Sequence, residues 1–211
     1  MVERQQGDSR YWSVPRCWAG ETAVVVGCGP SLTATQLACC RGKARVIVVN
    51  NAYEMAPWAD WLWATDWRWW RRYIVSRDNE LPPALTFAGE RITCSEEAAT
   101  FPGMRLLRMT GDDGYDPDPS AIRSGRNGGS VGIQLAMKAG VARIILLGID
   151  MAGGHFHNHY PPKWNCSSWK GIASRFAQLV PALKDLGVEV INCSPGSALQ
   201  TFPQAALGEV L

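Results

Sequence analysis

Two continuous apolar runs joined by a glycine turn constrain the fold of this chain more than any other feature. The first run spans residues 23–26 and leads into Gly27-Cys28-Gly29, while the second spans residues 46–49 and ends on two asparagines. Apolar runs without alternation are typical of strands buried on both faces, which belong to parallel sheets. Residues 32–40 between them predict a helix, so the stretch predicts a βαβ unit with a right-handed crossover.

The rest of the chain continues this alternation of strands and helices. Further strands are predicted over residues 61–65, 85–88, 105–109, 142–147 and 188–191. Further helices are predicted over residues 66–73, with Asp66 as cap, over residues 131–139 ending at Gly140, and over residues 168–186 ending at Gly187. The pattern predicts an α/β fold, a Rossmann-like three-layer sandwich with a central, mainly parallel sheet.

The length predicts a single domain with a large buried core over residues 1–211. Residues 1–20 are polar and then aromatic, and they predict an N-terminal arm laid over the first strand. Residues 111–120 consist of turn-forming residues and predict a mobile surface loop. Residues 151–168 contain every histidine of the chain and are predicted to form a lid loop.

The composition excludes several classes of partner and environment. The chain has 21 lysines and arginines against 19 aspartates and glutamates, a formal net charge of +2, so bulk charge gives no reason to expect nucleic acid or a membrane surface. Seven scattered cysteines without a CxxC pair predict reduced, mostly buried thiols. Residues 1–12 lack a signal-peptide core and no apolar run is long enough to span a membrane, so we expect a soluble cytoplasmic protein.

The glycine turn after the first strand predicts an anion site. Gly27 and Gly29 let the backbone approach a ligand closely, and Pro30 and Ser31 open the following helix. A helix start offers unpaired N–H groups and the positive end of a dipole, which suits a phosphate. The alternative is a tight turn without a ligand, because Gly-Cys-Gly-Pro-Ser-Leu is neither a P-loop nor a complete Rossmann fingerprint.

Polar residues also follow other predicted strands. Asn50 and Asn51 can read a base or ribose edge, or can serve as ordinary turn residues. Gly128, Gly129 and Ser130 open a predicted helix and form a second candidate anion site, or a merely flexible loop. Ligands of such folds bind beyond the carboxyl ends of the strands, so this convergence predicts a binding site. Asp66, Asp150 and residues 194–197 fall at the same edge.

The three histidines, His155, His157 and His159, lie in one short segment. In an extended segment their side chains share one face. One of them can act as a general base, since imidazole titrates near working pH, or the three can ligate a metal together with Asp150. A solvated loop is the third interpretation. We favour the base, because all the histidines of the chain gather here.

Tryptophans are concentrated beside arginines in residues 58–72. The tryptophans are Trp58, Trp61, Trp63, Trp67, Trp69 and Trp70, and the arginines are Arg68, Arg71 and Arg72. Aromatic side chains interleaved with arginines can stack bases or sugars, which makes Trp67–Arg72 a candidate nucleic-acid surface. They also build cores and subunit interfaces, including those of homo-oligomers, and this is the interpretation we favour.

The order of these landmarks resembles the metal-independent bacterial sialyltransferases and the related MptE-like (DUF115) group, which includes archaeal 6-hydroxymethylpterin pyrophosphokinases and flagellin-modifying transferases. It is also similar to small phage-encoded proteins with a tryptophan-rich third strand. The resemblance implies that Gly27, Gly29, Pro30, Ser31 and Asn50 bind a donor nucleotide and that Gly128, Gly129 and Ser130 lie near its phosphate. His157 or His159 would take the proton of an acceptor hydroxyl.

Two departures from the sialyltransferase pattern concern the donor. Cys28 stands where those enzymes have asparagine between the two glycines. Residues 151–154 supply no tyrosine to steady the departing phosphate, so only Tyr160 is left for that role. The donor therefore need not be CMP-sialic acid and can be another NDP-sugar.

The resemblance implies glycosyltransferase-like transfer, without a bound metal, from a nucleotide-activated donor to a hydroxyl of a small-molecule or glycan acceptor. The first alternative is an ATP-dependent pyrophosphokinase, in which Mg²⁺ is bound to the ATP phosphates and Asp66 or Asp150 assists the transfer. The second is a phage accessory or nucleic-acid-binding protein without catalysis, which would use the Trp67–Arg72 segment.

Overall fold

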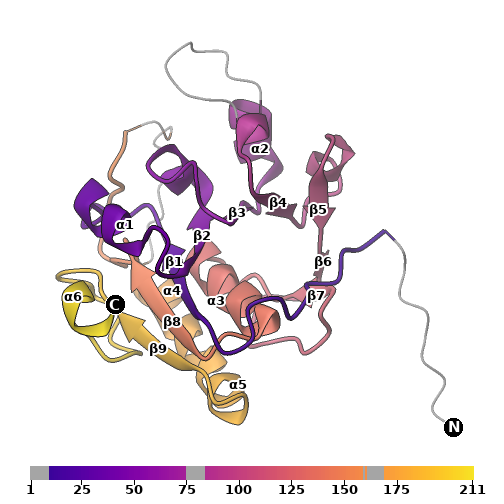
Figure 1. Cartoon of the computed structure of the whole chain (residues 1–211). Helices are drawn as coiled ribbons and strands as arrows, with labels where there is room; N and C mark the ends of the chain where they lie inside the picture. The colour runs from indigo at the N-terminus through magenta and orange to yellow at the C-terminus, as the bar shows by residue number, and fades with distance from the viewer. Residues whose placement is uncertain (1–9, 75–83, 159, 161–168) are drawn as a thin grey trace, which may run out of the picture.

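Seven parallel strands form one central sheet in the order β5-β4-β3-β2-β1-β8-β9 in the computed structural model, which describes residues 10–74, 84–158, 160 and 169–211 (Figure 1). The strands are β1 (Thr22–Val26), β2 (Arg45–Val49), β3 (Trp61–Trp63), β4 (Glu90–Thr93), β5 (Met104–Leu106), β8 (Arg143–Leu147) and β9 (Glu189–Asn192). Every pairing within this sheet is parallel. The predicted Rossmann-like α/β fold is confirmed.

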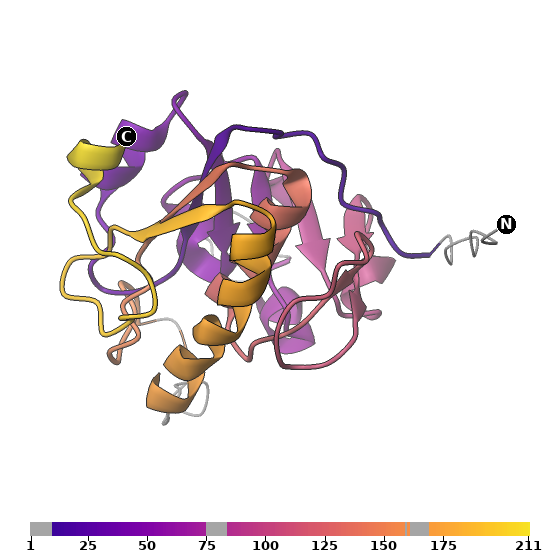
Figure 2. The ribbon, with the colours of Figure 1, turned by 90° about the horizontal axis from the view of Figure 1, so that it is seen from below.

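Both faces of the sheet are covered, which explains the unbroken apolar runs. The helices are α1 (Ala34–Cys40), α2 (Trp67–Tyr73), α3 (Gly128–Ala139), α4 (Trp169–Phe176), α5 (Val180–Asp185) and α6 (Leu207–Val210). Val25 of β1 packs in one cluster with residues of α3, α4 and α5, whereas its neighbours Val24 and Val26 pack in a second cluster with residues of α1 and α2. Figure 2 shows α4 and α5 on one side of the sheet and α1 with α6 on the other.

The predicted helix ends at Asp66 and Gly140 are observed, whereas α1 begins later than predicted. Thr33 caps α1 in a capping box with Gln36, whose backbone N–H donates to Thr33 Oγ1 over 3.2 Å. Asp66 caps α2 as predicted, accepting from Arg68 N over 2.8 Å. Gly140 ends α3 with φ +88°, a left-handed conformation that suits glycine.

The predicted strand over residues 85–88 is wrong. A 3₁₀ turn, η2 (Ala84–Thr86), lies there, and the strand begins at Glu90. The carbonyls of Leu85 and Phe87 accept from Arg91 Nη1 over 2.9 and 2.8 Å, so they bind a side chain instead of a neighbouring strand. This pairing of a turn with the next strand has no local sequence signature.

Two further predicted elements are divided in the structure. Residues 105–109 break at buried Leu107, after which β6 (Arg108–Met109) pairs with β7 (Ala121–Ile122) in a separate two-stranded sheet. The helix predicted over residues 168–186 breaks at η5 (Ala177–Leu179), and α5 starts with proline in its first turn. Proline lacks the N–H that would continue the preceding hydrogen-bond ladder.

The described part of the N-terminal arm is built into the core. Val14 and Trp18 are 3 % and 4 % exposed, and the Trp18 ring stacks on Trp61 at 3.9 Å. Trp18 N donates to Ala139 O at the end of α3 over 2.9 Å. The arm therefore crosses the α3 face of the sheet and covers β3.

Residues 111–126, here called the aspartate loop, are tied down by hydrogen bonds. Lys138 of α3 donates to the carbonyls of Asp116 and Asp118. Gln134 of the same helix accepts from Arg123 N over 3.0 Å and donates to Arg123 O over 2.7 Å. These bonds hold the aspartate loop on α3, including residues 111–120, which were predicted to form a mobile surface loop. None of the helices in the described ranges combines the length and apolar character that a membrane crossing requires.

Candidate functional site

A pocket lies where the strand order changes direction. β1 has β2 on one side and β8 on the other, and the connections from these strands leave to opposite faces. Such a switch point opens a crevice at the carboxyl ends of the strands. The pocket encloses about 90 Å³. Since one water occupies about 30 Å³ of liquid and whole-ligand sites run from about 300 Å³ upward, the pocket is too small to enclose a whole nucleotide.

Five segments line this pocket: Gly27–Gly29, Val49-Asn50, Asn127–Gly129, Gly148–Ala152 and Gly154-His155. Of the predicted nucleotide-binding residues, the lining includes Gly27, Gly29, Asn50, Gly128 and Gly129. Pro30, Ser31, Asn51 and Ser130 lie outside the lining. Five of the predicted residues therefore meet at one edge of the sheet, and the contacts of each residue are described next.

The two glycines of the first turn are required by packing against the turn after β8. A Cβ on Gly27 would lie 2.6 Å from Gly148 O, and one on Gly29 would overlap the Asp150 carboxylate. Gly29 N donates to Gly148 O over 2.8 Å. The close approach that these glycines permit is an approach of the chain to itself.

Asp150 places a negative charge at the spot predicted for phosphate. Its Oδ2 accepts from Ser31 N over 3.3 Å, and its side chain is buried with 7 % exposure. A phosphate charge about 4 Å from this carboxylate would be opposed by about 4 kcal/mol at an effective dielectric constant of 20. Moreover, α1 begins at Ala34, so Pro30 and Ser31 are not helix-start residues. The geometry therefore moves the expected anion site away from Ser31.

The start of α3 is the second candidate anion site that the sequence predicted. Asn127 caps this helix, its Oδ1 accepting from Gly129 N over 2.8 Å and from Ser130 N over 3.4 Å. A Cβ on Gly128 would overlap the Val49 side chain, so glycine lets the helix start reach the end of β2. The positive end of the α3 dipole therefore faces the pocket. Ser130 itself is 1 % exposed and lies beneath it.

The two asparagines after β2 have different roles. Asn50 lines the pocket. Asn51 is fully buried, where its Oδ1 accepts from Trp69 Nε1 over 2.7 Å and its Nδ2 donates to Glu54. Asn51 therefore fixes the η1 turn (Asn50–Glu54) against α2, and of the two asparagines only Asn50 lines the pocket.

Backbone strain gathers around the pocket. Among the described residues, three non-glycine residues have positive φ: Asn50 (+50°), Arg126 (+50°) and Met151 (+51°). The first and last line the pocket, and Arg126 precedes the cap of α3. The left-handed conformation costs about 1–2 kcal/mol for such residues. Strain of this kind concentrates at sites where function requires a particular backbone shape.

His155 is the histidine that reaches the pocket. Its ring stacks on His157 at 5.4 Å with an interplanar angle of 7°, and the loop is held by Phe156 N, which donates to Cys28 O over 2.8 Å. Burial lowers the pKa of His155 below its usual 6.5, and a hydrogen bond with the Cys28 backbone opposes this shift. At pH 7 the ring is therefore neutral and can accept a proton. His159 lies outside the described residues.

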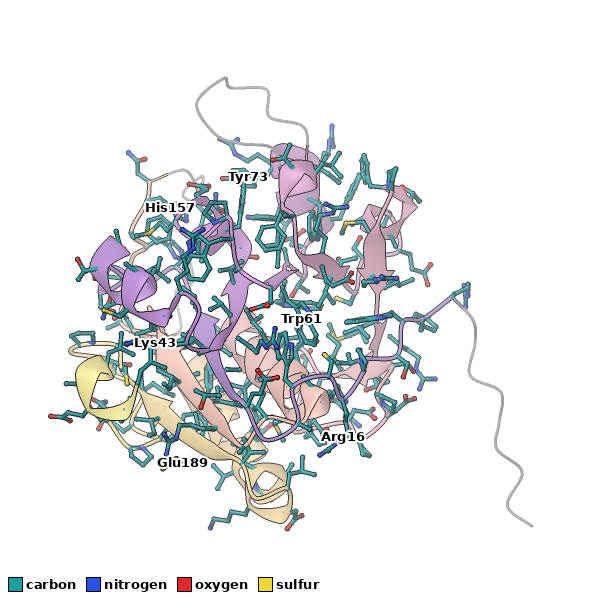
Figure 3. All side chains as sticks on the ribbon, viewed as in Figure 1. Arg16, Lys43, Trp61, Tyr73, His157 and Glu189 are labelled. Atoms are coloured by element: carbon teal, nitrogen blue, oxygen red, sulfur yellow. The ribbon has the colours of Figure 1, made fainter. Side chains whose placement is uncertain are left out.

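The rings of His157 and Tyr160 contact the ring of His155 and each other. The Tyr160 ring meets the rings of His155 and His157 edge-on at 4.8 and 4.6 Å. Burial raises the pKa of Tyr160 well above its ordinary value, and the nearby Cys28 and Tyr73 add to the shift. Neither His157 nor Tyr160 lines the pocket. Figure 3 places His157 and Tyr73 at one end of the sheet and Glu189 at the other.

Neither thiol chemistry nor a preformed metal centre marks the pocket. Cys28 is buried, donates to Val49 O over 3.2 Å, and has its pKa raised to about 12 by burial. A thiol of that pKa is not a nucleophile at neutral pH. The described residues contain no group of three or more histidine, cysteine or acidic side chains placed to hold a metal ion.

Most tryptophans of the aromatic segment belong to the core. Trp61, Trp63, Trp69 and Trp70 are at most 4 % exposed, so they cannot stack bases. Trp67 is half-buried and stacks on Phe101 at 6.1 Å. Arg68 pairs with Asp66 over 2.6 Å, which leaves Arg71 and Arg72 exposed without an ion pair in the described residues. The core interpretation holds for these four tryptophans.

Sequence reasoning did not place Asn127 in the site, and it assigned the base to His157 or His159 and not to His155. Asn127 precedes a glycine pair at a helix start, which is a capping signal. Asp150 and the histidine segment after it were predicted at this edge, but the sequence does not show which histidine reaches the pocket. No family model, curated protein or solved structure matches this chain. The resemblance to the sialyltransferases therefore stays a prediction, and the geometry of the pocket carries the functional proposal.

Proposed function

We propose that the chain is a transferase that uses this pocket to move a group, such as a sugar, from a nucleotide-activated donor to an acceptor hydroxyl. One observation supports this most: the carboxyl ends of β1, β2 and β8 and the start of α3 converge on one pocket at the switch point. Crevices of this kind are where open α/β sheets bind nucleotides. The donor would be a CMP- or other NDP-sugar.

The charges around the pocket set the orientation of the donor. Its phosphate lies at the start of α3, where Gly128 and Gly129 line the pocket and the dipole is favourable. Asn50, on the adjoining wall, can hydrogen-bond the nucleoside. The small volume means that the nucleotide enters with one group and extends across the open side.

His155 acts as the general base in this proposal. It accepts the proton of the acceptor hydroxyl as that oxygen bonds to the donor carbon. The bond from this carbon to the phosphate oxygen breaks, and its electron pair leaves on the phosphate, where the α3 dipole stabilises the charge. The lowered pKa keeps the ring neutral and ready to accept the proton. His157 and Tyr160 position this ring by contact, and His159 stays a second candidate for the base.

A specific observation favours one second candidate, the ATP-dependent pyrophosphokinase. A carboxylate in the pocket, Asp150, is a group that Mg²⁺ carried on ATP phosphates can bind. Turnover that requires Mg²⁺ and releases AMP distinguishes this reaction from metal-independent glycosyl transfer.

Thermal unfolding with a panel of nucleotides tests the proposal. CMP, UMP, AMP, GMP and their diphosphates are added at millimolar concentration. A nucleotide present at 100 times its Kd stabilises the native state by about 2.7 kcal/mol, which raises the Tm by roughly 5–10 °C for a domain of this size. The variant Asn50→Gly keeps the left-handed backbone, removes the amide and should reduce the shift. If no nucleotide raises the Tm of the unmodified protein, the proposed function is wrong.

A further inference from the structure

The Asp150 carboxylate is the buried acidic group with the fewest contacts in the described part of the chain. It is 7 % exposed and lines the pocket, yet its one hydrogen bond is the 3.3 Å contact from Ser31 N to Oδ2. No lysine, arginine or histidine forms an ion pair with it within the described residues. A buried charge with so few donors is costly unless something else supplies them.

A second unmatched polar atom lies at the same place. The hydroxyl of Ser31 is buried and makes no hydrogen bond within the described residues. Ser31 also provides the backbone N–H that contacts Asp150. The buried Ser31 hydroxyl therefore lacks a partner beside Asp150, and Oδ1 of Asp150 accepts no hydrogen bond from the described residues.

The missing partner has to donate hydrogen bonds and carry little negative charge. A phosphate is excluded by repulsion from Asp150, whereas a hydroxyl donates to the carboxylate without any charge penalty. Two adjacent hydroxyls match the two oxygens of one carboxylate.

We propose that Asp150 binds a vicinal diol of the ligand's sugar, so that the pocket selects its ligand by sugar hydroxyls at the glycine turn and by phosphate at α3. This inference rests on the proposed function and specifies it further. The diol can belong to the ribose of the nucleotide or to the transferred sugar. In both cases the ligand lies in the pocket with a fixed direction, sugar towards Asp150 and phosphate towards Asn127 and Gly128.

Calorimetric Kd values for UMP, 2′-deoxy-UMP and a UDP-sugar test the inference, measured with the unmodified protein, Asp150→Asn and Glu189→Gln. A hydrogen bond to a charged partner corresponds to roughly 10- to 100-fold in Kd. Asp150→Asn keeps the shape of the side chain, and Glu189→Gln removes an exposed carboxylate at the opposite edge of the sheet, paired with Arg143. Circular dichroism and Tm confirm that both variants fold.

Each outcome has a definite meaning. A preference for UMP over its deoxy counterpart that Asp150→Asn removes identifies the ribose as the source of the diol. A loss of affinity in Asp150→Asn that is confined to the UDP-sugar identifies the transferred sugar as the source of the diol. Three results for Asp150→Asn overturn the inference while the proposed function stands. They are unchanged affinities, tighter binding of every phosphate compound, and a loss of affinity that is seen only with Mg²⁺. Binding of no nucleotide by the unmodified protein contradicts the proposed function itself.

Discussion

The switch-point pocket and the aspartate loop are built from the same residue types, yet they treat their polar groups differently. In the loop, Asp112 accepts from Ser124 and from Arg126, and Asp118 accepts from Ser120 and from Arg108. In the pocket, Asp150 has one long hydrogen bond. The carboxylates of the loop have hydrogen-bond partners within the protein, whereas Asp150 in the pocket can accept further hydrogen bonds from a ligand.

This difference distinguishes a structural role from a binding role for turns rich in glycine, aspartate and serine. Buried or half-buried polar groups are normally matched inside the chain, so a matched group indicates structure. The hydrogen bond from Ser124 and the neighbouring Arg126 hold the pKa of Asp112 below its usual range, as expected for a carboxylate with internal partners. An unmatched group in a pocket indicates a ligand. The comparison predicts that changes in the loop affect stability and that changes in the pocket affect binding or turnover.

The largest expected effect is on turnover. His155→Ala should lower turnover by about 10²- to 10⁴-fold with nucleotide binding unchanged, because a general base contributes that much. The neutral ring is the active form, so turnover of the unmodified protein should fall as pH drops below 6.5 and through the lowered pKa of His155. Initial rates from pH 5 to 8 measure both effects. His157→Ala is the control and should lose less; full turnover in His155→Ala would assign the base elsewhere, with His159 tested next.

The largest expected effect on stability comes from the glycine turn. Gly29→Ala places a Cβ onto the Asp150 carboxylate and 2.6 Å from Gly148 O, a backbone atom that cannot move away. We expect a loss of about 3 kcal/mol in the free energy of unfolding, as for severe overpacking. Urea denaturation measures it. Gly208→Ala is the matched control, since a Cβ there has no atom within 4 Å. Equal stability of the two variants would contradict the described packing.

The aspartate loop should respond through Lys138. Lys138→Ala removes the donor to two carbonyls and a buried stem, so we expect a loss of about 2–3 kcal/mol in the free energy of unfolding. Lys138→Met keeps the stem and should lose less. Nucleotide binding should not change in either variant, and a changed Kd would break the separation between the two regions.

Lys138 also predicts a pH dependence of stability. Burial lowers its pKa to about 8 from its usual 10.5. Between these values the unfolded chain binds more protons than the folded one, so stability should rise with pH across this window. Urea midpoints at pH 7.5, 9 and 10.5 measure this rise, which should be absent in Lys138→Met. A rise of the same size in that variant would assign the effect to another group.

The smallest effect concerns the cap of α3. Asn127→Ala should cost about 1 kcal/mol in the free energy of unfolding, as should Thr33→Ala at the cap of α1. Asn127→Asp should keep the cap but add a negative charge beside the proposed phosphate, so its nucleotide Kd should rise while its stability is retained. Thr33→Ala lies outside the pocket and should leave the Kd unchanged. Equal nucleotide affinity in Asn127→Asp would place the phosphate elsewhere.

The sequence predicted the layers of the fold because the strands that carry them are buried on both faces. Residues 23–26 and 144–147 are apolar throughout, and the strands that contain them were located closely. β4 was missed because only Ile92 and Thr93 of its four residues are buried, which leaves no apolar run to detect. The break before α5 follows from Pro181. The sequence nevertheless predicts one continuous helix, because the helical pattern extends over many residues on both sides of this proline.

The candidate site was predictable as an edge but not as a set of residues. Parallel strands bring their carboxyl ends together, so Gly27, Asn50 and Gly128 could be placed at one edge without coordinates. Whether a polar group faces a ligand depends on partners that are distant in the chain. Asn51 accepts a hydrogen bond from Trp69. The backbone N–H of Ser31 donates to Asp150, which is 119 residues away in the chain. Such contacts leave no trace in a local pattern.

The central place of β1 has a consequence for synthesis. Its partner β8 begins at Arg143, roughly a hundred residues after β1 ends at Val26. At about 5–20 residues per second, a ribosome needs on the order of 10 s to deliver that partner. During this interval one side of an entirely apolar strand has no neighbour, and such an open edge invites pairing with other chains. Newly made protein should therefore benefit from chaperones until β8 emerges.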